Sequence, residues 1–262
     1  MKYKICVAMM SLALLASCTK TVEPQYLPVA PKSAFAGEPH QAKFADFSKL
    51  SSEFRIVRMQ SPYEYAKGTL VVDPTARFIY LQEGNGMALR YPIAVGKEGF
   101  EWAGDAIIGR RATWPQWRPT LSMKEANPAL KDVVEGGSDN PLGARALYLY
   151  DNGVDTLYRI HGTTNPASIG TASSSGCIRM FNEHVIDLYG RVPNGTPVVV
   201  LPLVIEGADG VQKAPETPEE YLNWMRDNVG KRVVSDFSGL AGALAGDAAG
   251  QTATTPDATT AQ

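Results

Sequence analysis

Cys177 and His161 are the two residues of this sequence whose types and spacing could support nucleophilic catalysis. A thiol attacks as its thiolate, and a cysteine with an ordinary pKa is mostly protonated at neutral pH, so it needs a nearby base. Sixteen positions separate the two residues, which leaves room for one loop to fold the thiol back against the imidazole. The alternative is an inert buried cysteine and a structural histidine at the end of a strand.

The residues around Cys177 favour the catalytic interpretation. Ser175 and Gly176 precede the thiol, and a glycine there permits a tight turn with backbone N–H groups directed at a developing oxyanion. Arg179 can hold a carboxylate through two parallel hydrogen bonds, or it can form a structural ion pair. Of the other histidines, His40 lies in a proline-rich segment and His184 is expected at an exposed position of a short helix.

The other two cysteines, Cys6 and Cys18, lie near the start of the chain. A positive start, an apolar stretch of about ten residues and small residues before Cys18 predict a signal peptide over residues 1–17, too short for a membrane span. The segment 15–18 resembles the lipobox of bacterial lipoproteins, which implies lipid attachment at Cys18. Thr19 then favours an outer-membrane anchor facing the periplasm in a bacterium with two membranes. An ordinary signal peptide with an accidental cysteine is the alternative.

Composition narrows the class of partners. The net charge is −2 and the longest basic run is Arg110-Arg111, so nucleic acid is not expected as the main partner. A hydrophobic content of 44% is ordinary for a globular core. The length suits one domain of about 150 residues with additional segments at both ends.

Strand patterns dominate the middle of the chain. Residues 69–73, 77–82 and 87–95 predict an antiparallel meander, and residues 145–150, 156–161 and 196–201 predict three later strands around a short helix at 182–189. The connection 96–143 is rich in Gly, Pro and Trp, with a helical pattern only at 124–134, and a connection of this length is usually functional. Trp114 and Trp117 on it either offer aromatic faces to a substrate or pack the loop onto the sheet.

These patterns divide the chain after the predicted signal peptide 1–17 into four further segments. Residues 18–65 are expected to form the lipidated N-terminus and a proline-rich tether, with a weakly indicated helix or packing arm at 44–62. Residues 66–203 form the predicted catalytic domain. Residues 204–237 form an extension with a short helix that begins after Thr217 and docks through an aromatic stripe, and residues 238–262 form a disordered tail rich in Ala, Gly and Thr.

The combined motifs resemble a known family. His161-Gly162-Thr163, followed by Ser174-Ser175-Gly176-Cys177-Ile178-Arg179-Met180, is similar to the signature of the L,D-transpeptidase catalytic domain, the YkuD or ErfK type. Segments 140–149 and 192–198 also resemble that family, so the resemblance covers about residues 68–203. Many members have a histidine where this chain has Ser175. The resemblance implies a mostly β fold: a β-sandwich of mixed sheets with one or two short helices and a long active-site loop.

The resemblance also implies a reaction and its residues. Cys177 would attack a peptidoglycan stem tetrapeptide and release D-alanine, with His161 as base and the Gly162 carbonyl holding the imidazole. Ser175 and Gly176 would lie at the oxyanion, and Arg179 would bind the stem. An amine acceptor would complete a cross-link, and β-lactams of the carbapenem class are expected as covalent inhibitors. No metal or cofactor is implied.

Three alternatives remain open at this point. Water in place of the amine would give an L,D-carboxypeptidase, and a lipoprotein acceptor would give an attaching or detaching enzyme. A peptidoglycan-binding lipoprotein that retained the fold without catalysis is the third.

Overall fold

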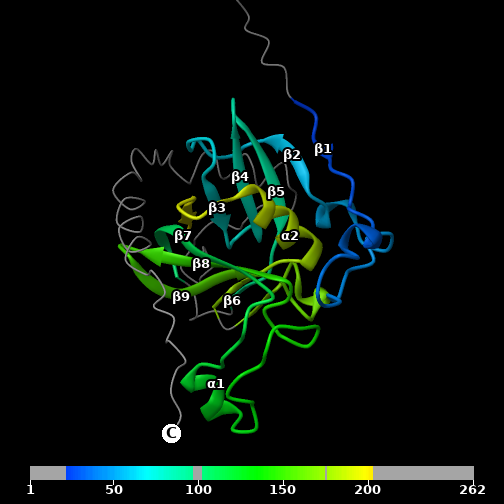
Figure 1. Ribbon diagram of the computed structural model, residues 1–262. Coiled ribbons are helices and arrows are strands. Elements are labelled where there is room, and N and C mark those ends of the chain that lie inside the picture. The colour runs from blue at the N-terminus through cyan, green and yellow to red at the C-terminus, as the bar shows by residue number, and fades with distance from the viewer. Residues whose placement is uncertain (1–21, 97–101, 175, 203–262) are drawn as a thin grey trace, which may run out of the picture.

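The structure is a computed structural model that describes residues 22–96, 102–174 and 176–202. A single mixed sheet of ten strands dominates it, in the order β1-β2-β5-β4-β3-β12-β7-β8-β9-β11, and β6 and β10 form a second small sheet (Figure 1). The strands are β1 Gln25–Tyr26, β2 Val57–Gln60, β3 Leu70–Asp73, β4 Phe78–Gly84, β5 Met87–Pro92, β6 Val95–Gly96, β7 Gly104–Thr113, β8 Arg145–Asp151, β9 Val154–His161, β10 Ala172–Ser174, β11 Ile178–Arg179 and β12 Pro197–Val200. The helices are α1 Leu121–Ala126 and α2 Asn182–Arg191, with 3-10 turns at Lys32–Phe35, Ser52–Phe54 and Pro166–Ser168.

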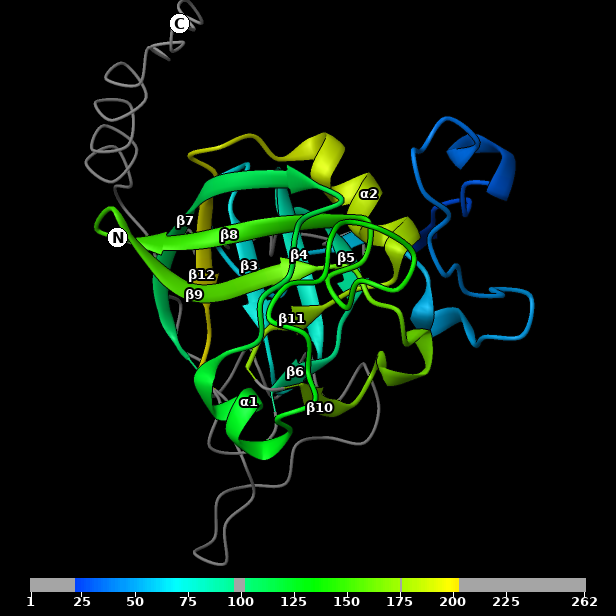
Figure 2. The same cartoon turned by 60° about the horizontal axis from the view of Figure 1, so that its bottom comes forward.

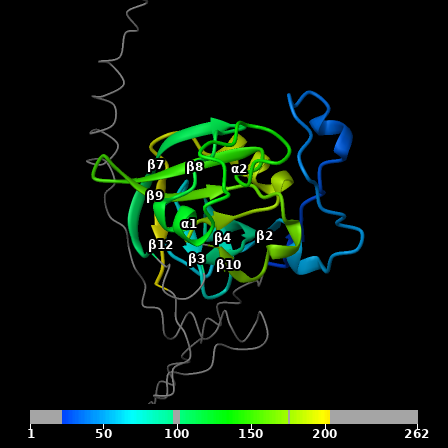
Figure 3. The same cartoon turned by 90° about the horizontal axis from the view of Figure 1, so that it is seen from below.

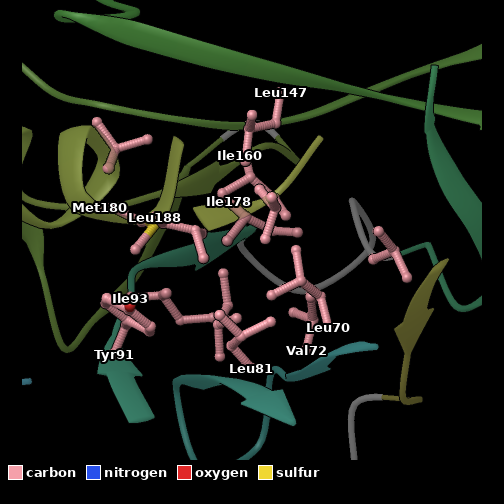
Figure 4. Packing of buried hydrophobic residues seen from close by; sticks show 14 of the residues in the cluster. Leu70, Val72, Leu81, Tyr91, Ile93, Leu147, Ile160, Ile178, Met180 and Leu188 are labelled. Atoms are coloured by element: carbon pink, nitrogen blue, oxygen red, sulfur yellow. The ribbon is translucent and has the colours of Figure 1, made fainter. Parts of the chain in front are cut away.

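The large sheet curls so that β7, β8 and β9 cross in front of β3, β4 and β5 (Figure 2). Apolar side chains from both layers meet in one core, which α2 covers at one end. Figure 4 shows this packing, with Leu70, Val72, Leu81, Tyr91 and Ile93 facing Leu147, Ile160 and Ile178. Burial of these side chains holds β9 and β11 in place from the core side.

The predicted mostly β class is confirmed, and the pairing is mixed as expected. β12 is parallel to β3 and antiparallel to β7, and β11 is parallel to β9. The two layers around the main core belong to one curled sheet. The six strand runs predicted at 69–95, 145–161 and 196–201 correspond to β3, β4, β5, β8, β9 and β12.

The long connection differs from its prediction, because it contains the ten-residue strand β7, which lies between β12 and β8 in the sheet. Ala106, Ile107 and Ile108 are all buried, on both faces of the sheet, so no period-two alternation marks them. The loop itself spans residues 114–144 and carries α1, which begins after the cap Thr120 and overlaps the helical pattern predicted at 124–134 only at residues 124–126. Asn140 ties this loop together: its amide donates to the carbonyls of Pro115, Val134 and Glu135 at 2.8–3.0 Å.

The N-terminal segment also differs from the predicted tether at 18–65. β2 pairs with β5 and β1 pairs with β2, so the sheet begins well before the predicted boundary at residue 66. Glu38 forms an ion pair with Arg145, and the backbone N–H of Ala45 donates to Glu183 at 2.7 Å. The contact of Ala45 agrees with the packing arm indicated at 44–62, but the earlier contact of Glu38 was not predicted, because it depends on single side chains with no periodicity. Figure 3 shows the segment, in blue, along one flank of the domain.

Several predicted features lie outside the described residues, namely the signal peptide, Cys18, Ser175, the extension at 204–237 and the tail at 238–262. Within the part of the chain that the structure describes, no helix is both long and apolar enough to span a bilayer.

Candidate active site

The parallel pair β9 and β11 brings the predicted site residues onto one face. Ile178 pairs with Ile160 and Arg179 pairs with His161, and both isoleucines point into the core. Since side chains alternate along a strand, His161 and Arg179 point the opposite way, together with the residues two positions earlier, Arg159 and Cys177. Four side chains therefore occupy the corners of a small patch, roughly 5 Å across the strands and about 7 Å along them.

His161 is buried, with 4% of its surface exposed. Its Nδ1–H donates to the Gly162 carbonyl at 2.6 Å, which leaves Nε2 without a proton and able to act as a base. Burial lowers the pKa of His161 to about 4, although that hydrogen bond opposes the shift, and the charges of Arg179 and Arg159 lower it further. The imidazole is therefore neutral at pH 7.

Cys177 is partly exposed at the end of the loop that follows η3, Pro166–Ser168. Burial raises the pKa of its thiol, while the charge of Arg159, a hydrogen bond with the Arg159 backbone and the charge of Arg179 act in the opposite direction. The resting site accordingly holds a thiol and a neutral imidazole. A neutral imidazole beside a thiol is the arrangement that general-base catalysis requires, because the base can take the thiol proton.

Gly176 has a φ of +113°, a backbone conformation that residues with a side chain rarely adopt. A glycine before the thiol is therefore required by the turn that presents Cys177 at the start of β11. The oxyanion role of the neighbouring N–H groups stays a prediction, as does the role of Ser175.

Arg179 is partly buried, and burial lowers its pKa, but a guanidinium remains charged at neutral pH. Its backbone N–H and C=O both bond Ala94 at 2.9 Å, which fixes the strand. Among the described residues, no acidic side chain lies within ion-pair distance of it. The ion-pair alternative thus has no partner in that part of the chain, and a carboxylate of a substrate can be bound.

Asn182 at the start of α2 is a positioning residue that the sequence did not reveal. Only 1% of it is exposed, its Oδ1 accepts from the Ala144 N–H at 3.0 Å, and its Nδ2 donates to the Thr163 carbonyl at 2.7 Å and the Lys43 carbonyl at 2.9 Å. It joins the end of the long loop, the segment after His161 and the N-terminal segment. A side-chain carbon on Gly162 would lie 2.2 Å from its Oδ1, so glycine is needed there.

Arg159 was also missed, although its position two residues before His161 on a strand was a usable signal. Its Nη2 donates to Asp155 at 3.0 Å, and its guanidinium lies 4.8 Å from the centre of the Tyr148 ring. It is the charged side chain with the largest effect on the Cys177 thiol.

The expected exposure of His184 is wrong, since only 1% of it is exposed. Phe47, Tyr91 and Phe181 surround its ring, and burial lowers its pKa to about 3. The helix position looked exposed because two of its three aromatic neighbours, Phe47 and Tyr91, come from distant segments.

Trp114 of the long loop does not offer its ring to a substrate, because it is buried and donates its Nε1–H to Glu38 at 2.7 Å. Trp102, earlier in the predicted connection, packs against the core. It stacks on Tyr158 with 5.6 Å between ring centres, and both line a small, mostly apolar depression that reaches Gly176. Within the described ranges, no three His, Cys, Asp or Glu side chains gather as metal ligands.

Comparison with known proteins agrees with this geometry. The family model of the YkuD L,D-transpeptidase catalytic domain matches residues 67–200. The chain belongs to this family. It is 34% identical over 140 residues to the probable L,D-transpeptidase YbiS of Escherichia coli, an alignment that covers 50% of this chain and 44% of YbiS. The chain therefore spans less than half the length of that relative.

Solved structures give two further similarities to this L,D-transpeptidase domain. A Brucella melitensis chain described as a probable carnitine operon oxidoreductase is 48% identical, with 59% of this chain and 98% of that chain covered and a TM-score of 0.41. The catalytic domain of the Enterococcus faecium L,D-transpeptidase, acylated by ertapenem, is 21% identical, with 51% and 95% covered and a TM-score of 0.39.

Proposed function

We propose that this protein is a cell-wall L,D-transpeptidase that acylates Cys177 with a peptidoglycan stem tetrapeptide and transfers the acyl group to an amine. Family membership supports the reaction class. The observation that carries the proposal is the register of β9 and β11, which puts His161, Cys177 and the guanidiniums of Arg159 and Arg179 on one face.

Acylation uses the neutral pair. His161 Nε2 takes the thiol proton as Cys177 Sγ attacks the carbonyl of the diamino acid, and the bond from that carbonyl to the nitrogen of D-alanine breaks. The same proton passes to the departing amine, so D-alanine leaves and a thioester remains. The Gly162 carbonyl keeps Nδ1 protonated throughout, which holds Nε2 in the basic form.

Transfer reverses these roles. An amine of a neighbouring stem attacks the thioester, His161 accepts its proton, and the carbon–sulfur bond breaks. The proton returns to Sγ, and the new amide is the cross-link. Arg179 holds a carboxylate of the stem, because it is a partly buried cation beside the thiol.

The test is incubation of the full-length protein with purified disaccharide tetrapeptide, followed by mass spectrometry of the products. We expect cross-linked dimers together with free D-alanine, and no products from Cys177→Ala. Tripeptides without dimers would identify a carboxypeptidase, and a product joined to a lipoprotein would identify an attaching enzyme. Absence of turnover by the wild type would leave a peptidoglycan-binding protein.

A lipid on Cys18 would hold the enzyme at the outer membrane, on the periplasmic side. The leader pattern before Cys18 supports this proposal. Labelling of cells with a radioactive fatty acid should mark the wild type and Cys6→Ser equally. Cys18→Ser should carry no label, and a labelled Cys18→Ser protein would contradict the anchor.

Carbapenems should acylate the same thiol, since a strained β-lactam carbonyl presents the same target to Cys177 as the scissile carbonyl. Ertapenem acylation of the related E. faecium domain motivates the choice of ligand. Intact mass should increase by one ertapenem in the wild type and remain unchanged in Cys177→Ser. An adduct on Cys177→Ser would place the reaction elsewhere.

A further inference from the structure

Arg159 differs from Arg179, the other cation of the site, in how its guanidinium is held. Asp155 binds one of its terminal nitrogens, Nη2, at 3.0 Å, and the Tyr148 ring supports the guanidinium plane. Its other terminal nitrogen, Nη1, is buried and has no hydrogen-bond partner. A buried donor without an acceptor is unusual in a folded protein and calls for an explanation.

The position of Nη1 supplies one. Ile178 pairs with Ile160, so continuing the parallel register by one residue places Cys177 opposite Arg159. A hydrogen bond between the thiol and the Arg159 backbone agrees with that register. The guanidinium therefore lies next to the reacting sulfur, on the face of the sheet that carries His161.

The cations of this face are arranged asymmetrically. Arg179, opposite His161, has no acidic partner among the residues of the described ranges, whereas Arg159, opposite Cys177, is fixed by Asp155 before any substrate arrives. A guanidinium fixed in this way loses little rotamer entropy on binding and offers a directed N–H. Its remaining donor suits an oxygen of a carboxylate, which forms strong charge-assisted hydrogen bonds.

We propose that Arg159 binds a carboxylate of the acyl-donor stem peptide through Nη1 and thereby selects the donor. The inference rests on the proposed function and goes beyond it by assigning a second carboxylate site beside Arg179. The stem offers this chemistry at the terminal D-alanine, at the far end of the diamino acid side chain and at the α-carboxyl of its D-glutamate.

The kinetic test compares Arg159→Gln with a matched control, Arg110→Gln. Arg110 is the other guanidinium on the Tyr148 ring, 3.7 Å from its centre, and it is exposed. Arg159→Gln should raise KM for the tetrapeptide by about 10- to 100-fold, the loss of one hydrogen bond to a charged group. Arg159→Lys should recover part of that loss, and Arg110→Gln should behave as the wild type.

Amidated donors identify the carboxylate. Three tetrapeptides, each with one of these carboxyl groups converted to an amide, are given to the wild type and to Arg159→Gln. With one of the three amidated donors, the wild type should show the increase in KM that Arg159→Gln shows with the unmodified donor. The two proteins should then have equal KM values for that donor. A penalty for Arg159→Gln that stays the same with all three donors would overturn the proposal.

Two further measurements separate this role from its competitors. Iodoacetamide, a small neutral alkylating reagent, should modify Cys177 at rates within about threefold in both proteins, because no carboxylate is involved. A decrease as large as the kinetic one would mean that Arg159 only tunes the thiol. Calorimetry measures the binding of the tetrapeptide without turnover. It compares the Cys177→Ala protein with the double variant that also carries Arg159→Gln.

That binding experiment keeps the two proposals distinguishable. Weaker binding in the double variant would support the carboxylate site even if the wild type formed no cross-links. Equal binding in both proteins, or no binding at all, would overturn the Arg159 proposal while leaving product formation by the wild type to be judged separately.

Discussion

Two buried histidines show what burial does and does not provide. His161 and His184 are 4% and 1% exposed, and burial lowers the pKa of both, to about 4 and about 3. His161 Nδ1 donates to the Gly162 carbonyl, and its ring shares a face of the sheet with the thiol. His184 is surrounded by aromatic rings, and neither of its ring nitrogens has a hydrogen-bond partner. A perturbed pKa alone thus does not mark a catalytic residue, and the neighbours decide.

The largest effect should come from replacing the histidine that has partners. His161→Gln removes the base, so kcat/KM should decrease by about 10²- to 10⁴-fold. His184→Phe places one more ring among three others and should retain activity within about twofold, since it touches no reacting group. The comparison fails if cross-linking assays show equal losses for the two variants.

Asn182 precedes His184 by two residues on α2, but its side chain bonds the segment that follows His161. Asn182→Ala leaves the Ala144 N–H and the Thr163 carbonyl without their bonds, so the free energy of unfolding should decrease by about 2–4 kcal/mol. Displacement of both segments should also reduce kcat by about tenfold. Denaturant unfolding and kinetics measure the two effects, with the exposed Asn194→Ala as control. A fully active, stable Asn182→Ala would show that α2 does not position the site.

The pKa of His161 sets the acid limb of activity. Because the base must be neutral and its pKa is about 4, kcat/KM should stay level from neutral pH down to about pH 5 and decrease tenfold per unit below about pH 4. Rates are measured in short assays, with circular dichroism confirming that the protein remains folded. A limb near the ordinary histidine value of about 6.5 would indicate that the imidazole is more solvated than its burial implies.

The smallest effect concerns His184 and stability. Its pKa is about 3 in the folded state, against the ordinary histidine value of 6.5 in the unfolded chain, so only the unfolded chain takes up its proton between these values. Stability is therefore lost as the pH falls from 6.5 toward 3. His184→Phe should remove up to about 1.4 kcal/mol per pH unit of that loss. Glu183 acts in the opposite direction: its pKa is raised to about 7 in the folded state, so its contribution to stability is lost as the pH rises from 4.5 toward 7.

Urea unfolding of the wild type and His184→Phe at several pH values between 3 and 7 measures this slope. The Glu183 contribution is common to both proteins and cancels in the difference. Parallel curves for the two proteins would mean that His184 is already protonated, or solvated, in the folded state.

Strands and turns that carry a local sequence pattern could be predicted from the sequence. The meander, the strand ending at His161 and the glycine turn before Cys177 follow from alternation and turn residues, so the placement of these two residues near each other was predictable. β7 was not, because residues buried on both faces show no alternation. Asn182 and the environment of His184 depend on contacts between distant segments, such as the bond of Asn182 to the Lys43 carbonyl and the ring contact of His184 with Phe47, which no local pattern contains.

The docked N-terminal segment has a consequence for where the enzyme can work. Because β1 is already paired with β2 at Gln25, only seven residue steps separate Cys18 from the folded domain. A fully extended chain covers at most about 3.6 Å per residue, so a lipid on Cys18 would keep the start of the domain within about 25 Å of the membrane. The protein would then reach only the layer of the wall that lies directly beneath the bilayer, and moving it deeper would require a longer linker between Cys18 and Gln25.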